Sequence, residues 1–235
     1  MKPHEFWQQI HDPLGADPEQ SHSDCYPAGF DDGRRLLLPI RPLADGEHAL
    51  ASLILNQASF DVVDAIAADL AAKLAVFQPE VVVGLPTLGL TLASAVAQKL
   101  GHRRYAPLGT SRKFWYREEL SVPLSSITTP DQQKRLYVDP RMLPLLEGRR
   151  VALIDDVISS GASMAAAIEL MACCKVEPAV LGAAMLQSDR WKERLARLGS
   201  AWPDKTIGVL ATPMLSKTPD NRWIAAAEAA APDRR

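Results

Sequence analysis

The segment VALIDDVISSGAS, residues 151–163, places two carboxylates at the end of an apolar run and follows them with hydroxyl-bearing and small residues. Ligands of open parallel sheets bind beyond the carboxyl ends of the strands, and Asp155 and Asp156 stand where such a strand would end. The serine-rich turn leads into a helical pattern, so its backbone N–H groups can converge on an anion with help from the helix dipole. The spacing therefore predicts an anion site beside two hydrogen-bond acceptors.

A sugar phosphate would satisfy both halves of this segment. With a phosphate at the turn, the carboxylates could accept hydrogen bonds from sugar hydroxyls or organise a hydrated Mg²⁺, and together these features describe a ribose 5-phosphate. In the alternative interpretation, Asp155 and Asp156 cap the helix and the serines fill a turn. Charged residues at a strand end face solvent more often than core, so we expect both carboxylates to lie at the surface.

Competing motifs are missing from the sequence. It contains no G-x-x-x-x-G-K-[ST], no G-x-G-x-x-G after a strand and no G-x-S-x-G. A phosphoacceptor aspartate of receiver type would stand after the first strand of a much shorter domain. The five histidines form no H-x-x-x-H pair, so a structural zinc site is not expected.

Apolar runs and helical patterns alternate around the acidic pair. Ser59 is a typical N-cap for a helix that ends before Pro79, and Gly101 would close a second helix as its C-terminal cap. Apolar runs separated by helices indicate parallel strands covered on both faces, so we predict an α/β fold with an open parallel sheet flanked by helices. The expected strands are 80–85, 103–108, 149–155, 178–187 and 205–212, and the expected helices are 60–77, 87–101 and 163–175.

The regions outside this alternation define the expected domains. Residues 1–58 hold an arm and, over residues 25–40, two extended stretches around the turn DDG, which predict a hairpin in a small cap. Residues 59–215 would form the core, in which residues 109–136 are a long irregular loop of the kind that is usually functional or mobile. Residues 216–235 are expected to be a C-terminal tail.

The composition excludes several classes of protein. The net charge of -2 offers no electrostatic argument for a nucleic acid or an anionic membrane as partner. Cys25, Cys173 and Cys174 are too few and too badly spaced for a disulfide framework. The first residues show no signal-peptide pattern, and no apolar run reaches the roughly 18 residues of a membrane helix. We therefore expect a cytoplasmic protein with no membrane or nucleic-acid partner.

The motif at residues 151–163 resembles the phosphoribosyl diphosphate binding motif of the type I phosphoribosyltransferases. In that family an earlier strand ends in a pyrophosphate-binding loop, which GLPTLGL at residues 84–90 matches, and a flexible hood loop precedes the motif, as residues 109–136 do here. The order of these parts most resembles the adenine phosphoribosyltransferase branch, over roughly residues 59–212. The resemblance implies a type I phosphoribosyltransferase core with a small N-terminal hood subdomain.

The resemblance also implies roles for individual residues. Asp155 and Asp156 would bind the ribose hydroxyls and, indirectly through substrate or water, a Mg²⁺ ion. Arg112 and Lys113 would reach the diphosphate when the hood loop closes; without the neighbouring motif they would be a solvated pair on a loop. The 5-phosphate would contact Ser159, Ser160, Gly161, Ala162 and Ser163, and the pyrophosphate loop would be Pro86, Thr87, Leu88 and Gly89. Ala162 stands where relatives often have a second glycine, and Thr87 and Leu88 stand where purine-specific relatives often have a charged residue.

The sequence offers two candidate residues for contact with the base. Gln187 could pair with a base edge and Trp191 could stack on the base, although Trp191 could equally be a helix residue that packs on the core. The aromatic residues 114–116 could seal the loop, meet a partner subunit or simply pack.

The implied reaction transfers ribose 5-phosphate from 5-phosphoribosyl 1-diphosphate to a nitrogenous base and releases diphosphate. The adenine-like order favours a purine, with a pyrimidine as second choice, and the family resemblance favours a homodimer. A different class, a non-catalytic sensor of phosphoribosyl diphosphate, would carry a winged-helix segment ahead of the domain. Residues 1–58 show no basic recognition helix, which favours an enzyme.

Overall fold

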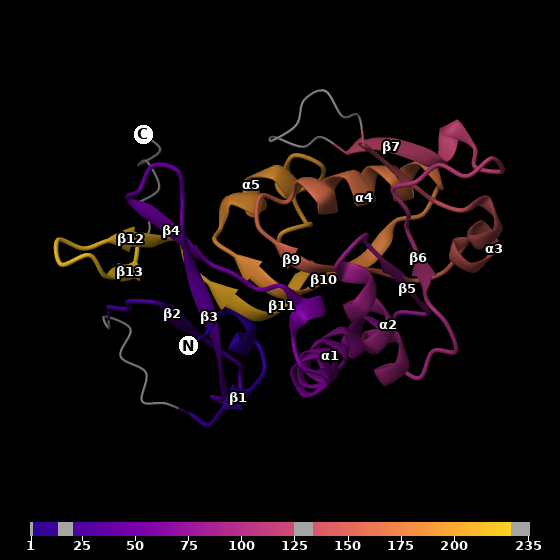
Figure 1. The fold of residues 1–235 in the computed structure, drawn as a ribbon. Coiled ribbons are helices and arrows are strands. Elements are labelled where there is room, and N and C mark those ends of the chain that lie inside the picture. The colour runs from indigo at the N-terminus through magenta and orange to yellow at the C-terminus, as the bar shows by residue number, and fades with distance from the viewer. Residues whose placement is uncertain (1, 14–20, 125–133, 227–235) are drawn as a thin grey trace.

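A parallel sheet of five strands forms the centre of the computed structural model, which describes residues 2–13, 21–124 and 134–226. Helices cover both faces of this sheet (Figure 1). The predicted open parallel sheet flanked by helices is therefore confirmed. The strand order is β11-β10-β9-β5-β6, with β5 at Val81–Gly84, β6 at Ala106–Pro107, β9 at Val151–Ile158, β10 at Pro178–Gln187 and β11 at Thr206–Thr212.

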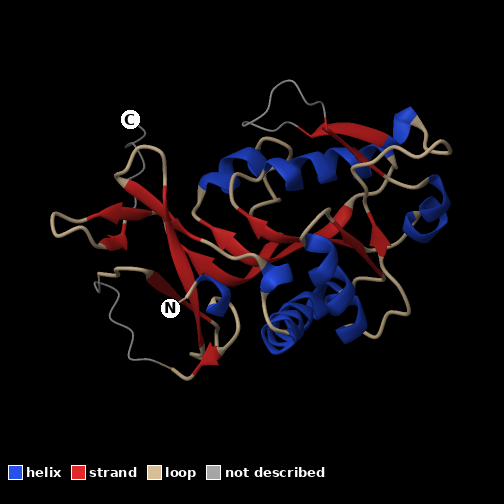
Figure 2. Cartoon of the chain, in the orientation of Figure 1, coloured by secondary structure: helices blue, strands red, loops and turns tan. Residues whose placement is uncertain are grey.

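The helices lie in two layers, one on each side of the sheet (Figure 2). Ser59 caps the first helix as predicted, because its side chain accepts a hydrogen bond from the Val62 N–H at 3.3 Å. Gly101 follows the second helix with a φ of 77°, a backbone conformation that favours glycine. One layer holds α1 at Phe60–Leu74 and α2 at Gly89–Lys99, and the other holds α4 at Ala162–Cys173 and α5 at Arg190–Ala196; the short α3 covers Leu143–Leu146. Among the described residues, no helix is both long and apolar enough to cross a membrane.

A hairpin within the expected irregular loop covers the outer side of α4. Strands β7, Ser121–Leu124, and β8, Lys134–Tyr137, pair antiparallel, and both contact α4. Val122 and Leu136 are buried in the same hydrophobic cluster as Met164. The prediction of one irregular loop over residues 109–136 is wrong for residues 121–124 and 134–136, because strands of four residues are too short to show a period, whereas residues 109–120 contain no strand. Residues 125–133 lie outside the described residues.

The N-terminal sheet, called the hood below, contains the predicted hairpin. Strands β2 and β3 pair antiparallel from Cys25 opposite Pro39 to Gly29 opposite Arg35. The last strands of the chain join the same sheet, because β12 pairs with β4. The full hood consists of β1 (Ile10–His11), β2 (Cys25–Gly29), β3 (Arg35–Pro42), β4 (His48–Ala51), β12 (Leu215–Lys217) and β13 (Trp223–Ala225).

The hood shows that a separate tail does not begin at residue 216. Leu215 and Trp223 are buried against Ile40 and Ala49, so residues 215–225 are held by the burial of their apolar side chains. Only residues 227–235 of the expected tail lie outside the described residues.

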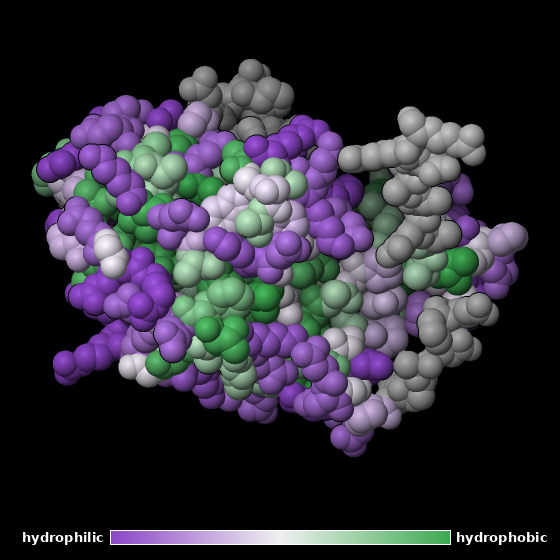
Figure 3. All heavy atoms as spheres, turned by 180° about the vertical axis from the view of Figure 1, so that it is seen from behind, coloured by the Kyte–Doolittle hydropathy of each residue, from purple (hydrophilic) through white to green (hydrophobic). Residues whose placement is uncertain are grey.

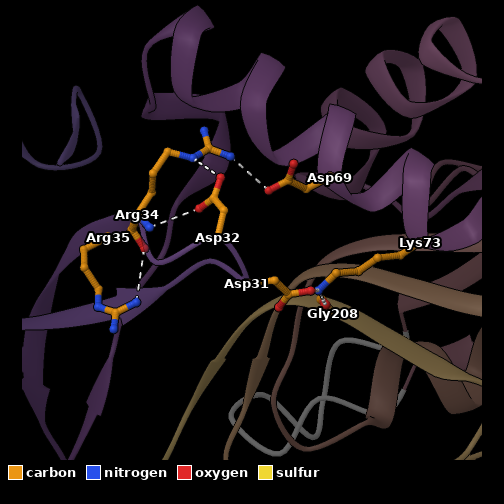
Figure 4. Close-up of polar contacts among 7 residues, drawn as sticks. All are labelled: Asp31, Asp32, Arg34, Arg35, Asp69, Lys73 and Gly208. Carbon is orange, nitrogen blue, oxygen red and sulfur yellow. Dashed lines mark hydrogen bonds and ion pairs between the residues drawn. The ribbon is translucent and has the colours of Figure 1, made fainter. Parts of the chain in front are cut away.

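Ion pairs join the hood hairpin to α1 (Figure 4). Asp69 and Lys73 lie one turn apart on α1, and each pairs with the hairpin turn. Arg34 Nη2 lies 3.3 Å from Asp69 Oδ2, and Lys73 Nζ lies 2.9 Å from Asp31 Oδ2. Lys73 Nζ also donates to the Gly208 carbonyl of β11 at 3.0 Å. One helix thus fixes the hood hairpin and the edge strand of the sheet together.

Candidate functional site

The acidic pair lies within β9 rather than at its end. Pairing with β5 stops at Ile154, whereas pairing with β10 continues to Ile158. Asp155 and Asp156 therefore follow the point where β5 turns away into the segment before α2. The predicted end of the strand at residue 155 is wrong on the β10 side and right on the β5 side.

The two carboxyls differ in burial. Asp155 is only 7% exposed, so the expectation that both face solvent is wrong for this residue. Burial and the neighbouring charge of Asp156 hold the pKa of Asp155 well above its ordinary value, and burial also raises the pKa of Asp156. The Asp156 N–H donates to Asp155 Oδ1 at 2.9 Å. A buried carboxylate with so few donors favours a ligand that brings hydroxyl donors of its own.

The predicted phosphate turn lines a small cavity. Its volume is about 140 Å³, and its wall includes Asp155 and every residue from Ser159 to Ser163. Gly161 has a φ of 73° and directly precedes α4, so the first turn of a helix of 12 residues faces this cavity. Free N–H groups at a helix start and the positive end of its dipole favour an anion there.

The predicted pyrophosphate loop contacts the acidic pair. Gly89 begins α2, and a Cβ atom added to it would lie 2.7 Å from Asp155 Oδ1 and 2.8 Å from Asp155 Cα. Only a residue without a side chain allows this approach. The peptide between Pro86 and Thr87 is cis, and Thr87 is exposed. The structure thus brings together three parts that the sequence placed far apart: this loop, the acidic pair and the phosphate turn.

This arrangement matches a known family. The family model described as a phosphoribosyl transferase domain matches residues 51–199. The chain belongs to this family. The matched range spans the acidic pair, the predicted phosphate turn, the predicted pyrophosphate loop and the predicted hood loop, and the fold is that of the type I phosphoribosyltransferases.

Two curated proteins are similar in sequence. The chain is 34% identical over 129 residues to the adenine phosphoribosyltransferase of Corynebacterium efficiens, covering 53% of this chain and 60% of that protein. It is 35% identical over 114 residues to the bifunctional protein PyrR of Pseudomonas putida, covering 46% of this chain and 58% of that one. The matched part is therefore less than two thirds of the length of these relatives.

Solved structures share the fold. The Giardia lamblia APRTase, solved with 9-deazaadenine, superposes with a TM-score of 0.58 at 20% identity, covering 74% of this chain and 93% of that one. The adenine phosphoribosyltransferase of Thermoanaerobacter pseudethanolicus also gives 0.58, at 15% identity, with 74% and 95% covered. The orotate phosphoribosyltransferase of Aeropyrum pernix gives 0.50 at 19% identity, with 73% and 85% covered.

The basic pair of this phosphoribosyltransferase domain stays apart from the acidic pair. Arg112 and Lys113 are exposed, and Arg112 Nη1 lies 3.5 Å from Glu118 Oε2. In the described part of the chain, no hydrogen bond or ion pair joins either residue to the acidic pair or to the phosphate turn. Their contact with a diphosphate stays a prediction that requires the loop to move.

The neighbouring aromatic residues divide into packed and exposed ones. Trp115 Nε1 donates to Asp139 Oδ2 at 3.4 Å, and the Arg141 guanidinium lies 4.7 Å from the centre of the Trp115 ring. Hydrogen bonds from Arg141 lower the pKa of Asp139 to about 2. Tyr116 lies against Tyr137, whereas Phe114 is 96% exposed. Tyr116 is therefore half-buried by packing, whereas Trp115 stays 39% exposed despite its contacts, and Phe114 contacts only the Trp115 ring, in a T-shaped arrangement, among the described aromatic residues.

Of the two residues expected to contact the base, Trp191 is not positioned as the stacking hypothesis requires, and Gln187 already has a partner in the hood. Trp191 is 3% exposed and packs in the core beside Gly161, which confirms the packing alternative and contradicts a stacking role. Gln187 ends β10 and is 8% exposed, and its Nε2 donates to the Ala51 carbonyl of the hood strand β4 at 2.5 Å. Because the amide nitrogen is already engaged, a contact between Gln187 and the base stays a prediction that concerns the amide oxygen.

Two arginines of α5 border the phosphate turn, and sequence analysis did not identify them. Arg190 Nη2 donates to Ser159 Oγ at 3.2 Å, and Arg194 Nε donates to the Ser160 carbonyl at 2.9 Å. Their spacing of four residues on a short helix after β10 was the available signal, because such residues share one helix face.

The donor set suits Mg²⁺ only as an indirectly held ion. Among the described residues, no group of three or more His, Cys, Asp or Glu side chains could hold a metal. Asp155 and Asp156 offer hard oxygen atoms, and Mg²⁺ usually keeps several waters and takes further ligands from substrate phosphates. The two residues therefore fit a metal that they would hold through water or substrate rather than by direct ligation.

Proposed function

We propose that this protein is a phosphoribosyltransferase that transfers ribose 5-phosphate from 5-phosphoribosyl 1-diphosphate to a purine base and releases diphosphate. The supporting observation is the contact of Gly89 with Asp155 at the edge of the phosphate cavity. Asp155 thus touches the candidate diphosphate loop on one side and lines the cavity of the phosphate turn on the other, which supports a single site made from these parts. A pentose that carries a phosphate at one end and a diphosphate at the other has its charges in this order.

The chemistry assigns a separate task to each part. Asp155 and Asp156 orient the sugar through its hydroxyls, and the phosphate turn anchors the other end, so that C1 faces the base. Positive charge develops on the sugar as the bond to diphosphate breaks, and the nearby carboxylates stabilise it. Arg112 and Lys113 oppose the negative charge of the departing diphosphate once their loop closes, and closure excludes water from the activated sugar. Mg²⁺, held by Asp155 and Asp156 through water or substrate, would neutralise further charge on the diphosphate when bound.

The preference for a purine rests on similarity to named relatives. The adenine phosphoribosyltransferase of Corynebacterium efficiens is 34% identical to this chain over 129 residues. The same fold also occurs in the orotate phosphoribosyltransferase of Aeropyrum pernix, so a pyrimidine is the second candidate. The sensor alternative is weaker, because the described part of residues 1–58 forms hood strands and short 3-10 turns rather than a DNA-binding helix pair.

The protein is further proposed to act as a cytoplasmic homodimer. Phe60 at the start of α1 is 92% exposed and Phe114 is 96% exposed, and large exposed apolar side chains often mark protein interfaces. One face of the molecule carries hydrophobic residues in its middle, ringed by hydrophilic ones (Figure 3). Sedimentation equilibrium of the full chain tests this assembly.

A base panel tests the reaction. Purified full-length protein is mixed with 5-phosphoribosyl 1-diphosphate, Mg²⁺ and, in turn, adenine, hypoxanthine, guanine, xanthine, orotate and uracil, and released diphosphate is measured. Turnover with a purine supports the proposal, and turnover only with a pyrimidine corrects the substrate. Binding of the sugar without turnover on any base would favour the sensor, and no binding would contradict both.

A further inference from the structure

Helix α5 holds the phosphate turn with one face. Arg190, Trp191 and Arg194 lie on this face, and all three contact the turn. Arg190 Nη2 lies 3.2 Å from Ser159 Oγ, and Arg194 Nε lies 2.9 Å from the Ser160 carbonyl. A Cβ on Gly161 would lie 3.2 Å from Trp191 Cβ and 3.3 Å from Trp191 Cα, so the start of the tryptophan side chain and its backbone pack against the turn.

The basic residues of α5 and its C-terminal cap differ in whether they form an ion pair. Lys192 pairs with Asp189 at 2.8 Å, and Arg197 pairs with Glu193 at 2.5 Å. Within the described part of the chain, Arg190 and Arg194 have no carboxylate partner. Among the described residues, Arg190 donates to the hydroxyls of Ser159 and Ser188 alone. The two cations that face the phosphate turn are thus the two that have no counter-ion.

The phosphate turn needs a cation from elsewhere. Residues 157–163 carry no basic side chain, and the buried carboxyl of Asp155 lines the same cavity. A phosphate monoester carries about −1.5 to −2 charges near pH 7. Serine hydroxyls and backbone N–H groups supply hydrogen bonds but no net charge, and the adjacent carboxylate would repel a phosphate. A guanidinium at the rim of the cavity would offset this repulsion.

We infer that Arg190 binds the phosphate of the substrate and makes the site selective for a phosphorylated sugar, with Arg194 as the positioning residue that holds the turn through the Ser160 carbonyl. This inference rests on the proposed function. A phosphate oxygen that accepts a hydrogen bond from Ser159 Oγ comes within reach of Arg190 Nη2, because the two donors are only 3.2 Å apart. The planar guanidinium can then donate two parallel hydrogen bonds to the phosphate.

Trp191 explains why Arg190 stays at this position. Trp191 is 3% exposed and belongs to the core cluster that also contains Met164 of α4, so α5 is anchored beside the turn, whereas Arg190 of the same helix is exposed. The arginine can therefore be replaced without opening the core. An exposed side chain with hydroxyl partners only should contribute little to the stability of the free protein.

The test compares Arg190→Gln and Arg190→Lys with the control Arg197→Gln on the same helix. Binding of ribose 5-phosphate, which lacks a diphosphate, is measured by isothermal titration calorimetry, and the melting temperature of each variant is recorded. We expect Arg190→Gln to weaken ribose 5-phosphate binding on the order of 10–100-fold, as for loss of hydrogen bonds between charged groups. Arg190→Lys should fall between wild type and Arg190→Gln, because lysine keeps the charge but not the paired donors. Arg197→Gln should change binding less than about 2-fold, since surface ion pairs contribute little.

The pH dependence separates direct contact from a structural role. The phosphate loses its second proton near pH 6, so wild-type affinity for ribose 5-phosphate should rise between about pH 5 and 7. Without the guanidinium this rise should be smaller. Equal affinity and equal pH profiles of Arg190→Gln and wild type would overturn the inference while leaving the proposed function intact. If wild type binds neither ribose 5-phosphate nor 5-phosphoribosyl 1-diphosphate, the proposed function itself fails, and the inference fails with it.

Discussion

At the scale of single residues, the buried Asp155 that is proposed to bind the sugar also lowers the stability of the free protein when it is ionised. Asp155 is buried beside Asp156 and the backbone of Gly89, with a pKa raised by burial and by the neighbouring carboxyl. A raised carboxyl pKa means that the folded protein holds a proton which the unfolded chain releases above about pH 4. Stability contributed by this group is therefore lost as the pH rises above that value. A sugar whose hydroxyls donate to the carboxylate would recover part of it.

Asp155→Asn should stabilise the free protein and weaken its binding of the sugar. Because the amide cannot ionise, the variant should unfold at a higher temperature than wild type at pH 7, and the difference should shrink toward pH 4. Affinity for 5-phosphoribosyl 1-diphosphate should fall on the order of 10–100-fold. Thermal unfolding between pH 4 and 8 and calorimetric titration measure the two effects.

The exposed Asp204 provides the control for this prediction. The unfolding temperature of Asp204→Asn should not rise above that of wild type as the pH increases. A stability gap between Asp155→Asn and wild type that narrows as the pH rises would show that the buried charge is not the cause.

Gly89→Ala should disturb the acidic pair through a steric contact. The new methyl group would lie 2.7 Å from Asp155 Oδ1 and 2.8 Å from Asp155 Cα, and the second atom belongs to the backbone and cannot rotate away. We expect a loss of about 1–3 kcal/mol in the free energy of unfolding, as for other overpacked sites, together with weaker sugar binding. Gly109→Ala is the matched control, because its nearest neighbour is Tyr116 Oη at 3.8 Å. Equal urea midpoints for the two variants would contradict the close approach.

At the scale of elements, the hairpin β7–β8 explains a feature of α4. The buried residues of α4 include Met164, Ala165, Ala166, Ala167, Ile168, Leu170 and Met171, so the helix has no wide polar face. A helix that is apolar on nearly all sides must be covered on nearly all sides. The parallel sheet covers one side and the hairpin covers the other, which makes the base of the hood loop part of the core.

Leu136→Ala should therefore cost as much as a core substitution. Leu136 is 1% exposed within the cluster that contains Met164, and we expect a loss of about 2–5 kcal/mol in the free energy of unfolding. Leu198→Ala, at a leucine that is 39% exposed, should cost less than about 1 kcal/mol. Chemical denaturation measures both values. A loss in the free energy of unfolding for Leu136→Ala as small as that for Leu198→Ala would contradict the inclusion of the hairpin in the hydrophobic core around α4.

At the scale of the whole molecule, both ends of the described chain build the hood. Strands from residues 10–51 and from residues 215–225 lie in one sheet, and Gln187 ties that sheet to the end of β10. The ion pairs of Lys73 and Arg34 add a second junction at α1. The hood is thus attached beside the candidate site by contacts from three separate parts of the sequence.

Truncation after residue 214 should destabilise the protein more than truncation after residue 226 does. The shorter chain lacks Leu215 and Trp223 and leaves Ile40 and Ala49 without cover. We expect its melting temperature to fall by several degrees, since removing two large buried side chains costs several kcal/mol. The longer chain loses only residues outside the described part. Equal melting temperatures for both truncations would show that β12 and β13 add nothing to the hood.

The sequence by itself determined the local and periodic features. Long apolar runs and capped helices predicted β5, β9, β10, β11, α1, α2 and α4, and residues 151–163 predicted the phosphate turn, because neighbouring residues produce these signals. The tertiary structure alone decided which distant segments meet. It buried Asp155 against Gly89, placed Trp191 in the core rather than on a base, brought Arg190 to Ser159, and joined residues 215–225 to the N-terminal strands. Each of these outcomes depends on burial and contact between residues far apart in the chain. Local sequence patterns do not predict which distant residues meet, because such contacts form only when the whole chain folds.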